Sequence, residues 1–312
     1  MNRKNKRIGF TTSLPVEVIV ATGHIPVDLN NLFINGDAQQ KISSAEHAGF
    51  PRNVCSWIKG IYTAALEADL LVVIAFGQKI GQEVIKLQKH EAINVHASLL
   101  PKYRGAAPIH WAIVNGETET GVSIITLAEK MDAGLVLGQG KIPILPDDTI
   151  ESVHDKLSDL AVPVLMRTIE EFAQDSVTYV EQDEAKVTYA PKLKRKDGYI
   201  NWDDAASQIN NLVRGLWPWP AAETVYVCSR TGKHWRVGIA KAQVVDRPHK
   251  KGDVTGTLDK NLNVICGDGA LQILELKPAG SRLMDFESYI NGHQCEPGDL
   301  FVSADKAMNG IL

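Results

Sequence analysis

Two things are scarce in this sequence: cysteine and long apolar segments. The four cysteines (Cys55, Cys228, Cys266 and Cys295) lie far apart without a Cys-x-x-Cys pair, so the sequence indicates neither a zinc site nor a disulfide framework. No apolar run approaches the roughly 20 residues of a membrane-spanning helix, and the charged start Met1–Phe10 is not followed by the apolar core of a signal peptide. We therefore expect a cytoplasmic protein that uses no metal and enters no membrane.

An overall positive charge is also lacking. The 312 residues carry a net charge of −4 and are 44% hydrophobic, which is typical of a globular protein long enough for two domains. Basic residues are nevertheless concentrated at Lys192, Lys194, Arg195 and Lys196, and residues 198–260 hold nine Lys or Arg against six Asp or Glu. Such a face can meet phosphates. Charge alone favours a simpler interpretation, a solvated linker before a mildly basic domain.

Strand and helix patterns alternate in the first part of the chain. The apolar run within residues 68–80 is typical of a strand covered on both faces. The remaining pattern predicts strands in 92–98 and 121–129 and helices in 81–90, 107–116 and 149–174, the last interrupted by Pro163. This alternation predicts an open, doubly wound α/β sheet that is mostly parallel.

The pattern changes after about residue 177. Short strand-like pieces follow, beginning with 177–182 and 186–193 and divided later by Gly, Asp and Asn, with one helix-like piece at 204–216. Many short strands between turn signals predict a small OB-like β-barrel. We therefore expect a first domain at 1–180, a basic linker at 181–197 and a barrel domain at 198–306.

The stretch Ile93–Trp111 raises the question of function. It places Asn94 and His96 in an otherwise apolar strand, just before a loop that contains Pro and Gly. Residues two apart on a strand share a face, and open α/β sheets bind ligands beyond the carboxyl ends of their strands. Asp132 follows the next predicted strand. We therefore expect an amide, an imidazole and a carboxylate to converge on one crevice.

These groups suit the attack of an amine on a formyl or acyl carbon. Asn94 can donate to the oxyanion, and His96 can donate to it or move a proton. Asp132 can orient the imidazole and favour its charged form. The alternative is that Asn94 and His96 are hydrogen-bonded packing residues and that Asp132 caps a turn. Spacing alone favours that alternative.

Two longer stretches resemble a known family. NVHASLLPKYRGAAPIHWAI (94–113) and ETGVSIITLAEKMDAGLVL (119–137) closely resemble the signature of folate-dependent formyltransferases. The resemblance implies that Asn94, His96 and Asp132 form the catalytic set. It also implies 10-formyltetrahydrofolate as co-substrate and a folate-binding loop formed by Ser98, Leu99, Leu100 and Pro101.

The second part of the chain resembles one branch of this family. YAPKLKRKDGYINWDDAASQINNLVRGLWPWPAA (189–222) and GDGALQILELKPAG (267–280) are similar to the C-terminal barrel of methionyl-tRNA formyltransferases. In that family the barrel and its basic linker contact tRNA. The resemblance spans about residues 67–302. It implies a monomer that formylates the α-amine of initiator methionyl-tRNA, with tRNA contacts at Lys192, Lys194 and Arg195.

The first 66 residues differ from that family. The family has a long basic loop that enters the tRNA acceptor end, whereas residues 33–47 contain no proline and Lys41 is their only Lys or Arg. Residues 8–66 resemble instead the amino-terminal part of a 2-hydroxyacyl-CoA dehydratase subunit, whose cysteines hold an iron–sulfur cluster. Cys55 matches one of those cysteines, but a single thiolate cannot hold a cluster.

Three alternatives to formylation of methionyl-tRNA therefore stay open. One is a formyltransferase with another amine acceptor, since the basic loop is missing. Another is a hybrid chain with weak or no activity that binds RNA through its barrel and linker. The third, a component of an iron–sulfur dehydratase, ranks last.

Overall fold

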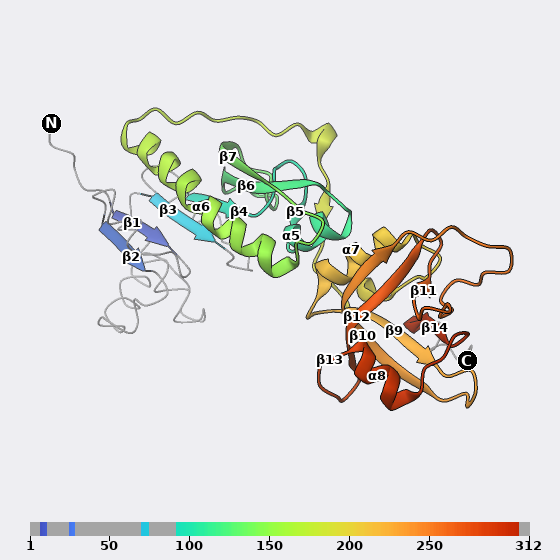
Figure 1. Ribbon diagram of the computed structural model, residues 1–312. Helices are drawn as coiled ribbons and strands as arrows, with labels where there is room; N and C mark the ends of the chain where they lie inside the picture. Colours follow the sequence, from blue (N-terminus) through green and yellow to red (C-terminus); the bar gives the residue numbers. More distant parts are fainter. Residues whose placement is uncertain (1–6, 11–24, 29–69, 75–91, 306–312) are drawn as a thin grey trace. The chain divides into compact units, whose positions relative to one another are not determined.

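The computed structural model describes residues 7–10, 25–28, 70–74 and 92–305, which belong to two compact units (Figure 1). Unit 1 is drawn from Met1–Ala106, Thr120–Ile142 and Asp155–Ala190, and unit 2 from Ala107–Glu119, Pro143–His154 and Pro191–Leu312. Among the described residues, no helix is both long and apolar enough to cross a membrane. The domain limits expected from the sequence stay a prediction.

Unit 1 contains an open sheet with strand order β2-β1-β3-β4-β6-β7. Its strands are β1 (Arg7–Phe10), β2 (Ile25–Asp28), β3 (Leu70–Ile74), β4 (Ala92–His96), β6 (Glu119–Thr126) and β7 (Val136–Pro143). Strand β1 pairs in parallel with β2 and β3, and β3 pairs in parallel with β4. Strand β6 runs antiparallel to β4. The predicted open, mostly parallel α/β sheet is confirmed, with an antiparallel portion that the sequence did not indicate.

Apolar residues on both faces explain the central strands. Leu70–Val73 of β3 are all buried, as expected for a strand covered on both sides.

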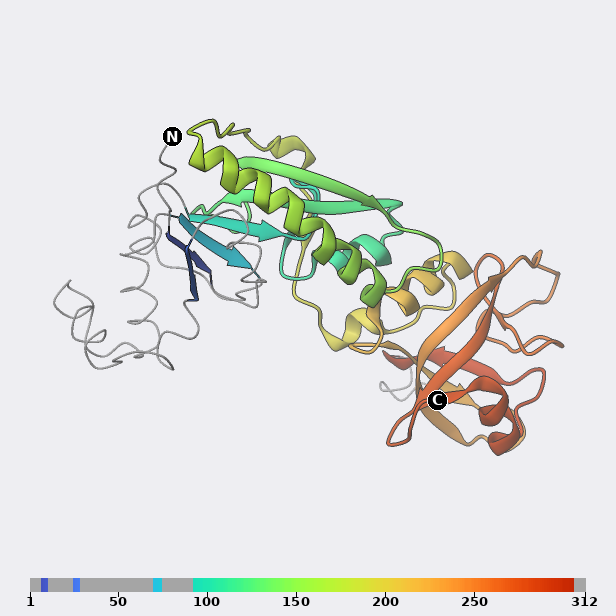
Figure 2. The ribbon, with the colours of Figure 1, turned by 60° about the vertical axis from the view of Figure 1, so that its left-hand side comes forward.

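Helix α6 (Ile150–Ala173) lies across β7 in Figures 1 and 2. A Cβ at Gly140 of β7 would lie 2.7 Å from Val164 and 2.9 Å from Leu160 of α6. Glycine therefore permits the close approach of this helix to the strand.

Several local predictions need correction. Helix α6 continues through Pro163, so the predicted interruption is wrong. Residues 177–193 form only the short strand β8 (Tyr189–Ala190), an isolated bridge at Val180 and the 3₁₀ turn η1 (Glu184–Lys186), rather than two strands. Strand β7 was not predicted. The helix predicted at 81–90 lies outside the described residues.

Unit 2 contains the helices α5, α7 and α8, a short turn and a sheet. Helix α5 (Pro108–Val114) ends two residues before Gly116, as the sequence predicts, and the φ of 72° at Gly116 suits glycine. Turn η2 (Arg195–Gly198) and helix α7 (Ala206–Leu216) follow the linker. The sheet strands are β9 (Ala222–Val227), β10 (His234–Val245), β11 (Val264–Ile265), β12 (Ala270–Pro278), β13 (Met284–Asp285) and β14 (Leu300–Ser303), with α8 (Phe286–His293) before β14.

The sheet of unit 2 nearly closes into a barrel. Its order is β11-β12-β10-β9-β14. Thr257 bridges Leu300 of β14, and the next residue, Leu258, bridges Val264 of β11, so one segment links the two edge strands. Closure removes the exposed sheet edges. The predicted small barrel is confirmed, whereas α8 was not predicted.

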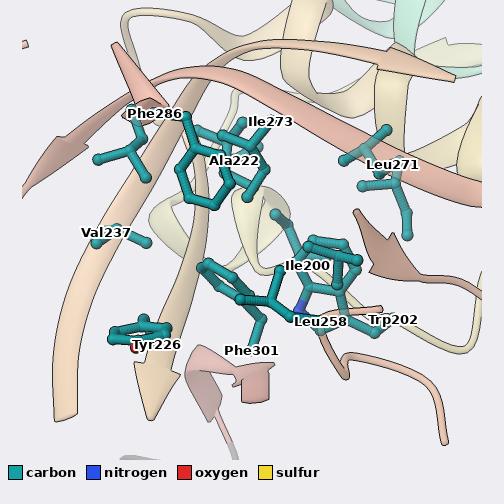
Figure 3. Packing of buried hydrophobic residues seen from close by; sticks show 14 of the residues in the cluster. Ile200, Trp202, Ala222, Tyr226, Val237, Leu258, Leu271, Ile273, Phe286 and Phe301 are labelled. Carbon is teal, nitrogen blue, oxygen red and sulfur yellow. The ribbon is translucent and has the colours of Figure 1, made fainter. Parts of the chain in front are cut away.

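The barrel encloses an aromatic core (Figure 3). The Phe301 ring lies 5.4 Å from the Tyr226 ring and 5.8 Å from the Trp202 ring, centroid to centroid. Trp202 Nε1 donates a hydrogen bond of 3.1 Å to Thr224 Oγ1, which satisfies its only polar group inside the core. Burial of these large rings, together with the aliphatic side chains around them, stabilises the unit.

One carboxylate is buried at the barrel wall. Asp299 is completely buried and accepts hydrogen bonds from Tyr226 Oη at 2.5 Å, from Ser229 N and Oγ at 2.7 Å each and from Glu296 N at 2.9 Å. Burial acts to raise the pKa of Asp299, but these hydrogen bonds outweigh it and hold the pKa below its ordinary value.

The free energy of unfolding should therefore depend on the protonation of Asp299. A folded-state pKa below the unfolded value, which is about 4, gives stability that is complete above that value and is lost as the pH falls through the folded pKa. We expect Asp299→Asn to lower the free energy of unfolding by about 1–3 kcal/mol at pH 7, with the difference shrinking below pH 4. Urea unfolding across pH, with the exposed Asp246→Asn as control, measures this. A pH-independent difference would contradict the assignment.

Candidate functional site

The end of β4 brings together the residues singled out in the sequence. Asn94 and His96 lie on one face of β4, and both side chains reach Asp132. Asn94 Nδ2 lies 3.5 Å from Asp132 Oδ1, and His96 Nδ1 lies 3.6 Å from Asp132 Oδ2. His96 is 6% exposed and Asp132 is 11% exposed. The predicted convergence of the three side chains is confirmed as a matter of geometry.

The reason given for that convergence was wrong. Strand β6 is antiparallel to β4, with Ile93 opposite Thr126 and His96 opposite Ser123, so the carboxyl end of β6 lies at the amino end of β4. Asp132 reaches the other end because the loop between β6 and β7 brings it there. The loop is held by Leu135 N, which donates to Thr126 Oγ1 at 2.9 Å.

Two backbone features shape this loop. Asp132 has a φ of 53°, in the left-handed region that Asp tolerates better than most residues. A Cβ at Gly134 would lie 1.7 Å from the carbonyl oxygen of Thr126, so only glycine fits there. The Met131–Gly134 turn therefore positions the Asp132 carboxylate over the face of β4.

A backbone donor fixes the same carboxylate. Gly105 N donates to Asp132 Oδ2 at 2.8 Å. Gly105 belongs to strand β5 (Arg104–Gly105), which pairs in parallel with β8 (Tyr189–Ala190). The Asp132 carboxylate thus joins β4, β5 and the β6–β7 loop.

Both ring nitrogens of His96 face acceptors. Nε2 lies 2.9 Å from the carbonyl oxygen of Tyr103, and because a carbonyl oxygen only accepts, Nε2 carries the proton of this hydrogen bond. Nδ1 faces the Asp132 carboxylate. Proton exchange by His96 would therefore take place at Nδ1, unless a ligand displaces the contact with Tyr103.

Gln182 and Arg104 hold the loop that carries Asp132. Gln182 Nε2 donates to the carbonyl oxygens of Asp132 and Gly134, at 2.8 Å each, and Gln182 Oε1 accepts from Arg104 Nε at 3.0 Å. Arg104 is buried and also donates to Glu184 at 2.8 Å, which lowers the pKa of that exposed carboxyl. Sequence reasoning missed Gln182 because no local pattern links it to residues 50 positions earlier.

The Ser98–Pro101 loop is held by internal hydrogen bonds. Ser98 is fully buried, and its Oγ donates to the Lys102 carbonyl oxygen at 2.6 Å. Leu100 is buried; its N donates to Ser123 Oγ at 3.0 Å, and its carbonyl oxygen accepts from Gln139 Nε2 at 2.9 Å. The Leu100–Pro101 peptide bond is cis. The hydrogen bonds therefore fix the loop that follows His96.

The basic segment lies in unit 2. Lys192 and Lys194 are exposed, whereas Arg195 pairs with Glu223 at 3.2 Å. Trp111 Nε1 of α5 donates to the Pro191 carbonyl oxygen at 2.8 Å, which fixes the start of the segment. Glu223 also pairs with Arg236, so part of the basic charge is neutralised within the unit.

The arrangement at β4 can stabilise a developing oxyanion and move a proton. It holds an amide donor and an imidazole at the end of β4, with the carboxylate of the β6–β7 loop 3.5 Å from the amide and 3.6 Å from the imidazole. Among the described residues, no group of three or more His, Cys, Asp or Glu side chains is placed to hold a metal ion.

Family models match both parts of the chain. A model described as "Formyl transferase" matches residues 59–169, and one described as "Formyl transferase, C-terminal domain" matches residues 192–294. Residues 1–58 lie outside both matches. The resemblance of residues 8–66 to a dehydratase subunit stays a prediction, although the formyl transferase match already begins at residue 59. Cys55 lies outside the described residues.

One relative in sequence and two solved structures are also similar to this chain. The methionyl-tRNA formyltransferase of Geobacter metallireducens is 40% identical over 233 residues, which cover 75% of this chain and 73% of that protein. HypX from Aquifex aeolicus, solved with tetrahydrofolic acid, matches with a TM-score of 0.58 at 18% identity over 91% of this chain, which spans about half the length of that protein. An N-formyltransferase from Helicobacter canadensis, solved with folinic acid and dTDP-3-aminofucose, matches with a TM-score of 0.56 at 16% identity, over 86% of this chain and 98% of that one. At these identities the two structures show a shared fold.

Removal of Gln182 should loosen the loop that carries Asp132. Gln182→Ala removes the donor to two carbonyl oxygens and the acceptor of Arg104 Nε, so we expect the free energy of unfolding to fall by about 1–3 kcal/mol. Denaturant unfolding measures this, with the exposed Gln174→Ala of the same unit as control. Equal stabilities for the two variants would contradict the supporting role.

Proposed function

This chain belongs to the methionyl-tRNA formyltransferase family, and we propose that it transfers the formyl group of 10-formyltetrahydrofolate to the α-amine of initiator methionyl-tRNA. Formyl transfer follows from the family itself. The identity of the acceptor rests on the 40% identity to a methionyl-tRNA formyltransferase over most of both chains. The single observation that supports the chemistry is the meeting of Asn94, His96 and Asp132 at the end of β4.

The chemistry needs one bond to form and one to break. The uncharged α-amine attacks the formyl carbon, the carbonyl oxygen becomes an oxyanion, and the bond from carbon to N10 of the folate then breaks. The amine loses a proton and N10 gains one. The residues must therefore stabilise negative charge on oxygen and return a proton to the leaving nitrogen.

We propose one role in this reaction for each of the three residues. Asn94 Nδ2 donates to the formyl oxygen as its charge develops, since its contact with Asp132, at 3.5 Å, is long and easily exchanged. His96 accepts the amine proton at Nδ1 and passes it toward N10. Asp132 fixes the orientation of the imidazole and compensates its charge while it is protonated.

The folate is proposed to lie along the Ser98–Pro101 loop. The hydrogen bonds of this loop are satisfied within the protein, so it offers a fixed, mainly apolar wall rather than free polar groups. A rigid wall holds the formyl carbon at a constant distance from β4, which is what a positioned attack requires.

A direct test combines the protein with 10-formyltetrahydrofolate and charged initiator methionyl-tRNA. We expect N-formylmethionyl-tRNA to form, and we expect His96→Ala and Asp132→Ala to abolish the product without unfolding the protein. Asn94→Ala should lower the rate by about 10²–10³, as expected for loss of one oxyanion donor. Near-normal turnover by any of these variants would remove that residue from the mechanism.

The identity of the amine that receives the formyl group is tested separately. If another amine is the true acceptor, the wild-type protein will consume 10-formyltetrahydrofolate with that amine and leave methionyl-tRNA unchanged. If the chain only binds RNA, it will bind tRNA in a salt-dependent way and consume no folate with any amine.

The exposed lysines of the linker are proposed to contact tRNA phosphates. Lys192→Ala and Lys194→Ala together should weaken tRNA binding and reduce the slope of log affinity against log salt by about 1 to 2, because two fewer phosphates are neutralised. Fluorescence titration across salt concentrations measures this. The matched control is the exposed pair Lys250→Ala and Lys251→Ala in the same unit. Equal slopes for the two double variants would contradict a specific role for the linker.

A further inference from the structure

Tyr189 is conspicuous among the aromatic residues that the structure describes. It is 72% exposed, whereas the tyrosines of the barrel core, Tyr226 and Tyr289, are fully buried. Its neighbour in β8, Ala190, is also fully buried. An aromatic ring left in water on an ordered strand loses the stabilisation that burial would give. Such a ring therefore suggests a ligand that covers it.

The position of Tyr189 relates it to the candidate site. In the parallel ladder between β5 and β8, Tyr189 lies opposite Arg104 and Ala190 lies opposite Gly105. Neighbouring strands are roughly 4.8 Å apart. Gly105 N donates directly to the Asp132 carboxylate, so Tyr189 lies on the strand next to the residue that contacts Asp132.

Close packing fixes this arrangement. A Cβ at Gly105 would lie 2.5 Å from the Ala190 carbonyl oxygen, so the two backbones are as near as glycine allows. Thr188 adds two contacts: its carbonyl oxygen accepts from Arg104 N at 2.9 Å, and its Oγ1 accepts from Tyr103 N at 2.9 Å. Tyr189 is therefore held at a constant place beside the site and is not on a free loop.

The residues around Tyr189 favour a ligand that stacks an uncharged ring on it. The segment before β8 carries Glu181, Asp183 and Glu184 against Lys186, so it has no excess of positive charge for a phosphate chain. Met131, the residue before Asp132 on the β6–β7 loop, is a 68% exposed apolar side chain. An aromatic ring beside a segment with more acidic than basic residues suits stacking with a nucleobase, which is uncharged and has a π face, rather than contact with a phosphate.

We propose that Tyr189 is a positioning residue on which the base of the terminal adenosine of methionyl-tRNA stacks. The inference rests on the proposed function, because the amino acid is esterified to that adenosine. The ester and one ribose separate the reacting amine from the base, so a platform one strand away from Gly105 is suitably placed for the base while the amine approaches Asn94 and His96. Stacking would orient the ester rather than take part in bond making.

Formylation kinetics give the first test. Tyr189→Ala should raise the KM for methionyl-tRNA roughly 5- to 150-fold, the range that loss of one base stack produces. Tyr189→Phe should restore it, because the ring remains, and Tyr189→Leu should not. The KM for 10-formyltetrahydrofolate should not change. Tyr179→Ala, a second exposed tyrosine of unit 1, is the control and should leave both KM values unchanged.

Binding gives a test that does not depend on activity. Initiator tRNA and the same tRNA without its terminal adenosine are titrated against the wild type and Tyr189→Ala. The wild type should bind the full tRNA more tightly, and this preference should vanish in Tyr189→Ala, as a double-mutant cycle requires for a direct contact. Equal weakening toward both tRNAs, or no weakening, would overturn the proposal. A raised KM for folate in place of tRNA would also overturn it, because the ring would then serve the co-substrate.

The two proposals fail in different ways. If the wild type forms no formyl-methionine, the proposed function fails, while the binding cycle still decides whether Tyr189 contacts the terminal adenosine. If the wild type is active and the cycle shows no coupling, only the role of Tyr189 is rejected.

Discussion

The acceptor capacity of one carboxylate organises the candidate site of unit 1. Asp132 takes a backbone hydrogen bond from Gly105 and faces both Asn94 and His96, so it joins β4, β5 and the β6–β7 loop. The loop can deliver it only because Asp132 adopts a left-handed conformation and Gly134 leaves room for the Thr126 carbonyl oxygen. Without this carboxylate, Asn94 and His96 would be two polar side chains at a strand end with no common partner, and the chemistry proposed for them would lack its geometry.

Much of this arrangement could be predicted from the sequence. The apolar run at β3, the i and i+2 spacing of Asn94 and His96 and the resemblance of 94–137 to formyltransferases all indicated a site at the end of β4. Spacing alone did not distinguish that site from ordinary packing, because a strand period says which face a residue is on and nothing about its partners. The resemblance favoured a catalytic site over packing, and the two family models show formyltransferase domains without assigning roles to these residues.

The rest depends on contacts that no local pattern records. The antiparallel direction of β6 cannot be read from its apolar residues, which would be the same in a parallel strand. The role of Gln182 depends on residues some 50 positions earlier, and Pro163 is accommodated within α6 despite its usual effect on helices. In the barrel, closure comes from single bridges at Thr257 and Leu258, which are too short to appear as strands in a sequence pattern.

The central claim is that the site at β4 moves a formyl group intact from folate to the amine of methionyl-tRNA. A single-turnover experiment with an isotopically labelled formyl group tests this most directly, with enzyme in excess over charged initiator tRNA. The account predicts that the label appears in ester-linked N-formylmethionine at the same rate as 10-formyltetrahydrofolate disappears. Label recovered as free formate, or folate left unconsumed by the folded protein, would contradict it.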